Sequence, residues 1–180
     1  MLKHGILGLL NYYDMTGYEV MEAFRDSLSY FWYAQTSQIY RELQTLEKNG
    51  WVSKTVVFQT GKPNKNVYSI TEEGKTELLS WIADGGAMIN SRNSILMKVF
   101  FMGERSHEEN IAYFKRFKQE CEEFLIKLAA VPKYIETYGN YIEEKEKTVY
   151  WQMTMDFGRR NMQTYIDWAQ ECIRQLESIK

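Results

Sequence analysis

The stretch from Gln35 to Gly74 constrains the fold of this chain more than any other part of its sequence. Apolar residues at Ile39, Leu43 and Leu46 recur at helical spacing, which predicts an amphipathic helix over 36–49 with one buried stripe. A threonine stands at the predicted N-cap, and an Asn-Gly pair closes the helix, because both residues tolerate the left-handed conformation that a helix end requires.

Two predicted strands follow this helix. Residues 51–59 are rich in β-branched and aromatic side chains, and residues 67–70 alternate between apolar and polar types. The loop between them, 60–66, combines Gly, Pro and Asn with two lysines, a composition typical of a turn. Thr71 then predicts the N-cap of another helix, since acidic residues fill the first turn behind it.

A helix followed by a hairpin with a basic tip is typical of a winged helix-turn-helix. Such a helix fits a major groove, and the hairpin tip reaches the neighbouring backbone or minor groove. The polar face of the predicted helix can hydrogen-bond to base edges and phosphates, although an ordinary amphipathic surface helix remains the alternative. The residues expected to contact DNA are Tyr18, Thr36, Ser37, Gln38, Tyr40, Arg41, Gln44, Lys62, Asn64 and Lys65.

The segment before this helix predicts two further helices. Residues 3–11 are too densely apolar for a solvated helix, and Thr16 begins a second helix with Glu19 completing a capping box. At the start of this second helix, Tyr18 could anchor a phosphate or lie half-buried in the core. The aromatic run 30–33 leads into the recognition helix, and we expect it to hold that helix against the core, with stacking on a ligand as the alternative.

Gly85-Gly86 breaks a helix that ends near residue 84, and this break predicts two domains. We expect a DNA-binding domain at 1–84, a linker at 85–93 and a helical domain at 94–180. Residues 94–102 are apolar nearly all round, which predicts a buried helix. Long helices are predicted from Ser106, capped with the help of Glu109, and over 148–179, whereas 133–147 is either a continuation or a loop.

Both long helices carry an apolar seam with spacings of three and four residues. In a chain of 180 residues two such seams cannot bury each other fully, so we expect a C2 homodimer through this half. The residues expected at that dimer interface are Phe114, Phe117, Cys121, Phe124, Leu128, Trp151, Met155, Met162, Tyr165, Ala169 and Leu176.

Charge and composition narrow the function classes. The formal net charge is −2, and residues 1–84 carry 8 Lys and Arg against 10 Asp and Glu, whereas residues 48–71 hold four lysines and no acid. The positive charge thus lies on the hairpin, and a dimer would double its phosphate contacts. No apolar run approaches the ~20 residues that cross a bilayer, so we expect a cytoplasmic protein without a signal peptide or membrane partner.

The sequence shows no arrangement typical of catalysis, a metal or a cofactor. His4 and His107 lie far apart, no nucleophile occupies a recognisable elbow, and acid pairs resemble solvated faces. Cys121 and Cys172 fall in separate helical patterns, so inert core thiols are expected, with a redox sensor as the alternative. We therefore expect no enzyme, no metal and no cofactor.

Three stretches of the first half together resemble the PadR family of bacterial transcriptional regulators. They are Ser37-Gln38-Ile39-Tyr40-Arg41-Glu42-Leu43, Leu46-Glu47-Lys48-Asn49-Gly50-Trp51-Val52 and Val67-Tyr68-Ser69-Ile70-Thr71-Glu72-Glu73-Gly74, with Ile6–Leu10 and Thr16–Glu19 matching the first two helices. The second half resembles, more loosely, the family's virulence-activator-type dimerisation domain. The resemblance implies a mainly α fold with a small β-hairpin wing, a homodimer and, most often, a repressor.

The resemblance also implies partners. Two copies would read a pseudo-palindromic DNA operator with half-sites ~34–36 Å, or a multiple of it, apart. A small aromatic effector is a further implied partner, since family members respond to phenolic or planar hydrophobic compounds. Tyr13, Phe100, Trp151 and Met155 could line its cavity at the dimer interface, and ordinary core packing is the alternative for each.

Two rival functions stay open at this point. A winged-helix module for protein–protein contact, without specific DNA binding, would suit the net −2 of residues 1–84 and the 15% aromatic content. A small-molecule-binding or catalytic dimer that keeps the winged-helix scaffold is the other rival. Positive potential on the recognition face would argue against the first, and absence of saturable aromatic binding against the second.

Overall fold

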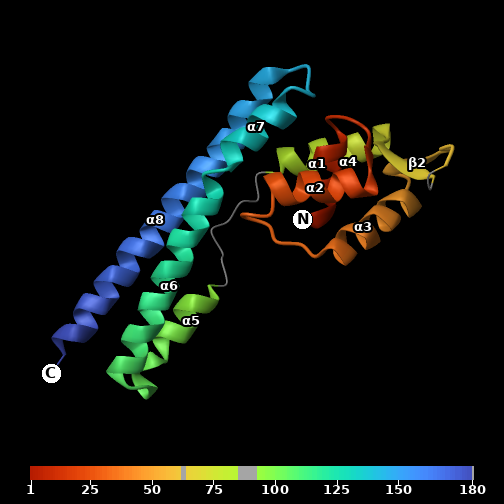
Figure 1. Cartoon of the computed structure of the whole chain (residues 1–180). Coiled ribbons are helices and arrows are strands. Elements are labelled where there is room, and N and C mark those ends of the chain that lie inside the picture. Colours follow the sequence, from red (N-terminus) through yellow and green to blue (C-terminus); the bar gives the residue numbers. More distant parts are fainter. Residues whose placement is uncertain (62–63, 85–92, 180) are drawn as a thin grey trace. The chain divides into compact units, whose positions relative to one another are not determined.

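The computed structural model describes residues 1–61, 64–84 and 93–179, and most of them are helical (Figure 1). A mainly α fold with a small sheet was expected, and it is confirmed. The elements in chain order are α1 (Leu2–Leu10), β1 (Met15–Thr16), α2 (Gly17–Ser27), α3 (Thr36–Lys48), β2 (Val52–Val57), β3 (Lys65–Ile70), α4 (Glu72–Ala83), α5 (Ser94–Phe100), a 3-10 turn (Met102–Glu104), α6 (His107–Leu128), α7 (Val131–Gly139), a second 3-10 turn (Lys145–Lys147) and α8 (Thr148–Ser178). Within the described ranges, no helix combines the length and the apolar composition that a membrane span requires.

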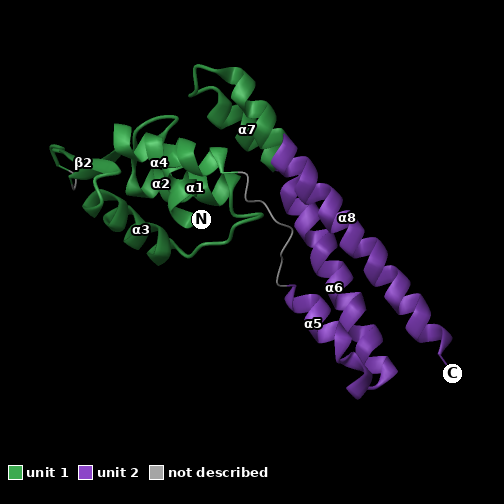
Figure 2. Ribbon diagram, turned by 180° about the vertical axis from the view of Figure 1, so that it is seen from behind, with its two compact units in different colours: residues 1–86, 131–152 green, residues 87–130, 153–180 purple. Residues whose placement is uncertain are grey.

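The chain divides into two compact units, coloured separately in Figure 2. The first unit comprises residues 1–86 and 131–152, and the second comprises residues 87–130 and 153–180. The segment 131–152 was expected in the C-terminal domain, whereas it groups with the N-terminal residues. Most of the expected linker, 85–92, lies outside the described residues.

Local sequence signals set the helix starts of the first unit. The Thr16 hydroxyl accepts from the Glu19 N–H at 3.2 Å, and the Glu19 carboxylate accepts from the Thr16 N–H at 2.7 Å, so the expected capping box is present. Thr71 likewise accepts from the Gly74 N–H at 3.1 Å. For α3 the expectation was wrong by one residue, because Gln35 rather than Thr36 is the N-cap.

The sheet contains one strand that the sequence did not predict. Residues 12–15 were expected to be a connection, but Met15–Thr16 forms β1 and pairs with β3. The sheet is antiparallel in the order β1-β3-β2, with Met15 opposite Tyr68 and Lys54 opposite Tyr68 from the other side. The wing is therefore anchored at its base by a third strand, while its outer part is a two-stranded ribbon.

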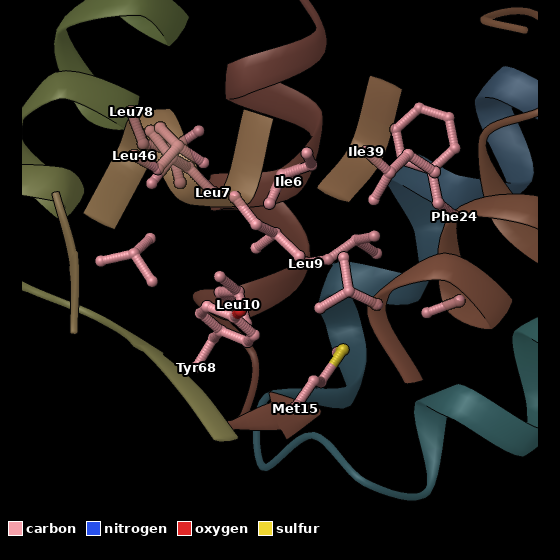
Figure 3. Close-up of a cluster of buried hydrophobic side chains, with 14 residues drawn as sticks. Ile6, Leu7, Leu9, Leu10, Met15, Phe24, Ile39, Leu46, Tyr68 and Leu78 are labelled. Atoms are coloured by element: carbon pink, nitrogen blue, oxygen red, sulfur yellow. The ribbon is translucent and has the colours of Figure 1, made fainter. Parts of the chain in front are cut away.

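The core of the first unit draws on every helix of the winged-helix part and on the sheet (Figure 3). Its largest fully buried side chains are Ile6, Leu7, Leu10, Met15, Val20, Phe24, Leu43, Leu46 and Val52. Burying each such side chain contributes about 1.5–3 kcal/mol. At the edge of this core, α4 lies very close to the backbone of Trp51. A Cβ on Gly74 would lie 2.1 Å from the Trp51 carbonyl oxygen, so this position requires glycine.

Aromatic contacts explain why residues 131–152 belong to the first unit. The Tyr138 hydroxyl on α7 donates to Asp26 Oδ2 on α2 at 3.0 Å, and burial together with this bond raises the pKa of Tyr138. The indole N–H of Trp151, on the first turn of α8, donates to the Tyr12 hydroxyl at 3.0 Å, with the rings edge-on at 5.2 Å. Tyr141 lies 5.7 Å from Tyr13 between ring centroids.

The second unit is built on the pairing of α6 with the C-terminal part of α8. Phe114 and Ala169 are buried between them, and Lys118 donates to the Gln170 side chain at 2.8 Å. The Ser106–Glu109 capping box is present at the start of α6, as expected. The buried helix expected at 94–102 is not observed, because within the described range 93–179 no residue of α5 is buried.

The seams expected to form the dimer interface are used largely inside one chain. Phe114, Cys121, Leu128 and Ala169 are buried by their own protomer, and Phe117 contacts Tyr165 edge-on at 5.7 Å. Burial also raises the pKa of the Cys121 and Cys172 thiols, which keeps both protonated at neutral pH. The large apolar side chains that the described part of the second unit leaves exposed are Leu96, Met97, Phe100, Phe101, Ile126, Met153, Phe157 and Ile179.

Candidate nucleic-acid interface

Helix α3 separates a buried apolar face from an exposed polar face. Ile39, Leu43 and Leu46 are buried in the first unit, as the periodicity predicted. All six α3 residues expected to contact DNA are exposed, namely Thr36, Ser37, Gln38, Tyr40, Arg41 and Gln44. The helix therefore presents hydroxyl, amide and guanidinium groups to solvent, and these groups bond to base edges and phosphates.

Hydrogen bonds within α3 fix two of these side chains. The Gln38 side chain Oε1 accepts from the Gln35 N–H at 2.8 Å, so this residue caps the helix in addition to any outside contact. Arg41 Nε donates to the Ser37 carbonyl oxygen one turn earlier at 3.2 Å. This bond lays the guanidinium along the outer face of the helix and reduces the rotamer freedom that a DNA contact would have to freeze.

Gly17 at the start of α2 holds Tyr40 in place. A Cβ on Gly17 would lie 2.7 Å from Cε1 of the Tyr40 ring, so the ring rests directly on the glycine backbone. The sequence signal was visible as a glycine inside the Thr16–Glu19 capping motif, but the partner could not be read from it. Tyr40 is thus a packed side chain with one exposed edge rather than a freely rotating one.

The neighbouring Tyr18 has a different partner from the phosphate expected for it. Its hydroxyl donates to Glu22 Oε1 at 2.8 Å, and this hydrogen bond to a carboxylate raises the pKa of Tyr18. Arg25 approaches the same carboxylate at 3.4 Å. A carboxylate beside the hydroxyl repels a phosphate, so this contact does not favour Tyr18 as an anchor.

The wing carries less free positive charge than its sequence indicated. Lys54 on β2 forms an ion pair with Glu47 on α3, Nζ to Oε1 2.8 Å, which neutralises one of the four lysines of 48–71. Asn64 and Lys65 are exposed near the tip, where Asn64 Oδ1 accepts from the Gln59 N–H at 3.3 Å. Lys62, also expected to contact DNA, lies outside the described residues.

The aromatic run before α3 is exposed, which corrects the expectation of a packed turn. Phe31, Trp32 and Tyr33 all face solvent, and Tyr33 is 79% exposed. Trp32 is 38% exposed and Tyr30 is half-buried, with its ring edge-on to Phe31 at 4.8 Å. The core is closed by the α1, α2 and α3 side chains without this run, so nothing draws the three aromatic rings inward.

Of the residues expected around an aromatic effector, two lie in the first unit. Trp151 contacts Tyr12 and Tyr13 contacts Tyr141, in two separate ring pairs. Phe100 and Met155 belong to the second unit. In the described part of the chain, no three His, Cys, Asp or Glu residues are arranged to hold a metal ion.

Two family models match the chain in sequence. Residues 6–80 match the transcriptional regulator PadR-like family, and residues 91–177 match the family described as virulence activator alpha C-term. The probable transcriptional regulator Rv1176c of Mycobacterium tuberculosis is 46% identical over 83 residues, which are 46% of this chain and 44% of that protein. The negative transcriptional regulator PadR of Bacillus subtilis is 33% identical over 116 residues, 64% of each chain. Each match therefore spans less than two thirds of the relative.

Solved structures are similar over nearly the whole chain. The crystal structure of Bacillus subtilis PadR in complex with operator DNA has a TM-score of 0.80 at 24% identity, covering 97% of this chain and 98% of that one. The complex of the same protein with p-coumaric acid has a TM-score of 0.76 at 22% identity, covering 98% and 96%. At these identities the likeness shows the fold, and it confirms the expected winged-helix architecture.

Proposed function

We propose that this protein is a homodimeric repressor of the PadR-like family of transcriptional regulators, whose model matches residues 6–80, and that it binds a specific DNA operator. The main support for the proposal is that α3 has one buried apolar face and one exposed polar face. Its apolar side is fixed in the core, and its polar side, from Ser37 to Gln44, faces solvent beside a hairpin with an exposed lysine. A rigid helix with an outward polar face is what a major groove accepts.

Each protomer places α3 in a major groove. Ser37, Arg41 and Gln44 contact base edges, while the Tyr40 ring, held on Gly17, packs against the groove wall. Asn64 and Lys65 of the wing contact the neighbouring backbone or minor groove, and the sequence assigns Lys62 to the same contact. Arg41 is the residue that reads sequence most strongly, since a guanidinium bonds bidentately to guanine.

The dimer forms through the second unit. Its α5 exposes Leu96, Met97 and Phe100, and α6 and α8 expose further large apolar side chains such as Phe157. Exposed apolar residues of this size favour an interaction surface, and a C2 partner covers two copies of it at once. Two copies then read a pseudo-palindrome with half-sites about 34–36 Å, or a multiple of it, apart.

Repression and effector control follow from the relatives by analogy. The Bacillus subtilis relative is named a negative transcriptional regulator, and one of its structures holds p-coumaric acid. We propose that this protein is cytoplasmic and that a small aromatic compound contacts the Tyr12–Trp151 ring pair or the Tyr13–Tyr141 ring pair. Such a ligand shifts the dimer between two states only if it binds them with different affinity.

Fluorescence anisotropy tests the proposal. The purified dimer is titrated onto DNA from upstream of its own gene and onto scrambled DNA at several salt concentrations. We expect preferential binding with a steep salt dependence, and a loss of about 1–3 kcal/mol for Arg41→Ala on the specific DNA alone. Lys65→Ala should weaken binding to all sequences and reduce the salt slope by about one.

Matched controls are available on other elements. Arg116 on α6 and Lys75 on α4 are exposed cations outside the proposed interface, and their alanine variants should bind like wild type. If Arg41→Ala and Lys65→Ala also bind like wild type, the assignment of the interface is wrong. Equal and weak binding of wild type to both DNAs contradicts specific recognition of the upstream site.

Two observations support one rival function, a winged-helix module that binds a protein instead of DNA. The exposed aromatic run at 31–33 and the Lys54–Glu47 ion pair suit a protein-binding surface better than a purely electrostatic DNA footprint. In that case the variants Phe31→Ala and Tyr33→Ala would abolish a protein complex. The anisotropy experiment separates the two, because a protein-binding module gives no sequence preference and no steep salt slope.

A further inference from the structure

The outer part of the wing exposes apolar side chains. Val56 and Val57 end strand β2 and are exposed, and Phe58 directly after them is 82% exposed. In the sequence these residues only indicated a strand, since β-branched and aromatic types favour one. In water, a phenylalanine that is 82% exposed adds no stability to the hairpin. The exposed apolar residues 56–58 are therefore expected to bind a partner.

The strand register shows which way this apolar group faces. Side chains alternate along β2, so Val52, Lys54 and Val56 share one face of the hairpin, and Phe58 follows directly after the last strand residue, Val57. Val52 on this face is buried in the core, and Lys54 pairs with Glu47 of α3. The face that carries Val56 is therefore the one that turns toward the recognition helix, beside which β2 lies in Figure 1, and Phe58 continues the exposed apolar stretch beyond the strand.

The surroundings of Phe58 indicate the chemistry of its partner. Asn66 stands opposite Val56 and Lys65 opposite Val57, and Asn64 closes the tip by accepting from the Gln59 N–H. Residues 48–71 contain no acidic side chain. Protein interface cores are depleted of lysine, whereas a DNA minor groove offers apolar deoxyribose walls between two rows of phosphates.

We propose that Phe58 is an apolar minor-groove contact, flanking the half-site that α3 reads. The proposal rests on the function proposed above and adds a residue to it. Lys65, which shares the Val57 face of the hairpin, engages the phosphate row, while Phe58 enters the groove and packs against sugars and a base step. This contact depends on groove width and on how easily the step deforms, so it gives sequence preference at positions without hydrogen bonds.

The test uses the full-length dimer and an operator duplex that wild type enriches from a random pool. Phe58→Ala should weaken operator binding about tenfold with an unchanged salt slope, because an apolar contact releases no counterions. Phe58→Leu should recover part of the loss. Hydroxyl-radical footprinting should show that Phe58→Ala loses protection of the minor groove beside each half-site and nowhere else.

Two further variants control the comparison. Lys65→Ala should lower the salt slope, which separates phosphate contact from apolar contact at the same wing. Ile82→Ala removes an exposed apolar side chain from the last turn of α4, and it should bind DNA like wild type. Circular dichroism and sedimentation of each variant verify that fold and dimer are retained.

The outcomes are distinct. If Phe58→Ala binds the operator and protects it like wild type while Arg41→Ala loses affinity, the wing contact is wrong and the proposed function stands. If Phe58→Ala loses dimer formation or a protein partner instead of DNA affinity, the wing contact is also wrong. If wild type enriches no DNA at all, the proposed function fails and the wing contact fails with it.

Discussion

In the first unit Ile6, Leu7 and Leu43 are fully buried, whereas within the described range 93–179 no residue of α5 in the second unit is buried. The first unit closes one continuous core from α1, α2, α3, the sheet and α4. The second unit buries Phe114 and Ala169 between α6 and α8, yet it leaves Phe100 82% exposed.

This difference suggests separate roles for the two units. A unit that closes its own core can hold a recognition helix rigidly, because tertiary burial of one face fixes the other face in space. In the proposed dimer, the second unit, in which no described residue of α5 is buried, would gain stability from a second copy. The predictions below alter one side of this contrast at a time, from the largest expected effect to the smallest.

The largest effect is expected from the first core. Leu43→Ala removes a fully buried side chain from the face of α3 that faces the core, and it should lower the free energy of unfolding of the first unit by about 3 kcal/mol. Chemical denaturation at two protein concentrations measures it. The loss should be the same at both concentrations, and a loss that disappears at high concentration would contradict a self-sufficient core.

The next effect concerns the uncovered surface. Phe100→Ser should weaken dimer formation by about 2 kcal/mol, roughly 30-fold in the dissociation constant, because a large central aromatic is removed from the proposed interface. Sedimentation equilibrium measures this constant. Leu79→Ser on α4 of the first unit, also an exposed apolar residue, serves as the control and should leave the dimer intact. Equal dissociation constants for wild type and Phe100→Ser would remove α5 from the interface.

A smaller effect is expected where 131–152 joins the first unit. Tyr138→Phe removes the hydrogen bond to Asp26 at 3.0 Å and should cost about 1 kcal/mol of stability of the first unit. Tyr134→Phe, a more exposed tyrosine on the same helix, is the matched control. The first unit should unfold at lower denaturant concentration in Tyr138→Phe only. Identical curves for both variants would mean that this bond contributes nothing.

The same tyrosine predicts a pH dependence. Its folded-state pKa is raised above the ordinary value of 10.0, so the folded state holds the phenol proton more tightly than the unfolded chain does. This contribution to stability is complete below pH 10 and is lost as the pH rises further, because only the unfolded chain then releases the proton. Melting curves across this range should show a steeper alkaline decline for wild type than for Tyr138→Phe.

The smallest effects compare two identical caps, one in each unit. Thr16→Ala and Ser106→Ala each remove a capping-box hydroxyl and should cost about 0.5–1 kcal/mol. The Thr16 variant should also lower operator affinity slightly, since α2 supports Tyr40 through Gly17. The Ser106 variant should leave the affinity per dimer unchanged. The reverse pattern would contradict the division between the two units.

Signals that act over a few residues could be read from the sequence. The caps at Thr16, Thr71 and Ser106 follow from hydrogen bonds between residues three apart, and the stripe of α3 follows from its period. Strand β1 could not be found this way, because two residues show no alternation and its partner on β3 lies about fifty positions away. Periodicity identifies a helix or strand, but it does not identify the element that packs against it or pairs with it.

The same limit applies to the seams, to α5 and to the charge of the hairpin, because the sequence does not identify the partner of each. The seam residues Phe114 and Ala169 are apolar at helical spacing, but a seam does not state whether its partner is the same chain or another. Likewise the apolar composition of α5 does not state what covers it, since Val99 packs against the core of its own unit and Phe100 is exposed. The sequence counts Lys54 toward the positive charge of the hairpin, whereas in the structure Lys54 forms an ion pair with Glu47 on α3.

The most direct test of the central claim is selection of the wild-type dimer on a pool of random DNA duplexes, followed by sequencing. A regulator that reads one half-site per protomer should enrich an inverted repeat whose halves lie about one helical turn, or a multiple of it, apart. Enrichment of no motif, or of a single motif without its inverted copy, would contradict DNA reading by a symmetric dimer.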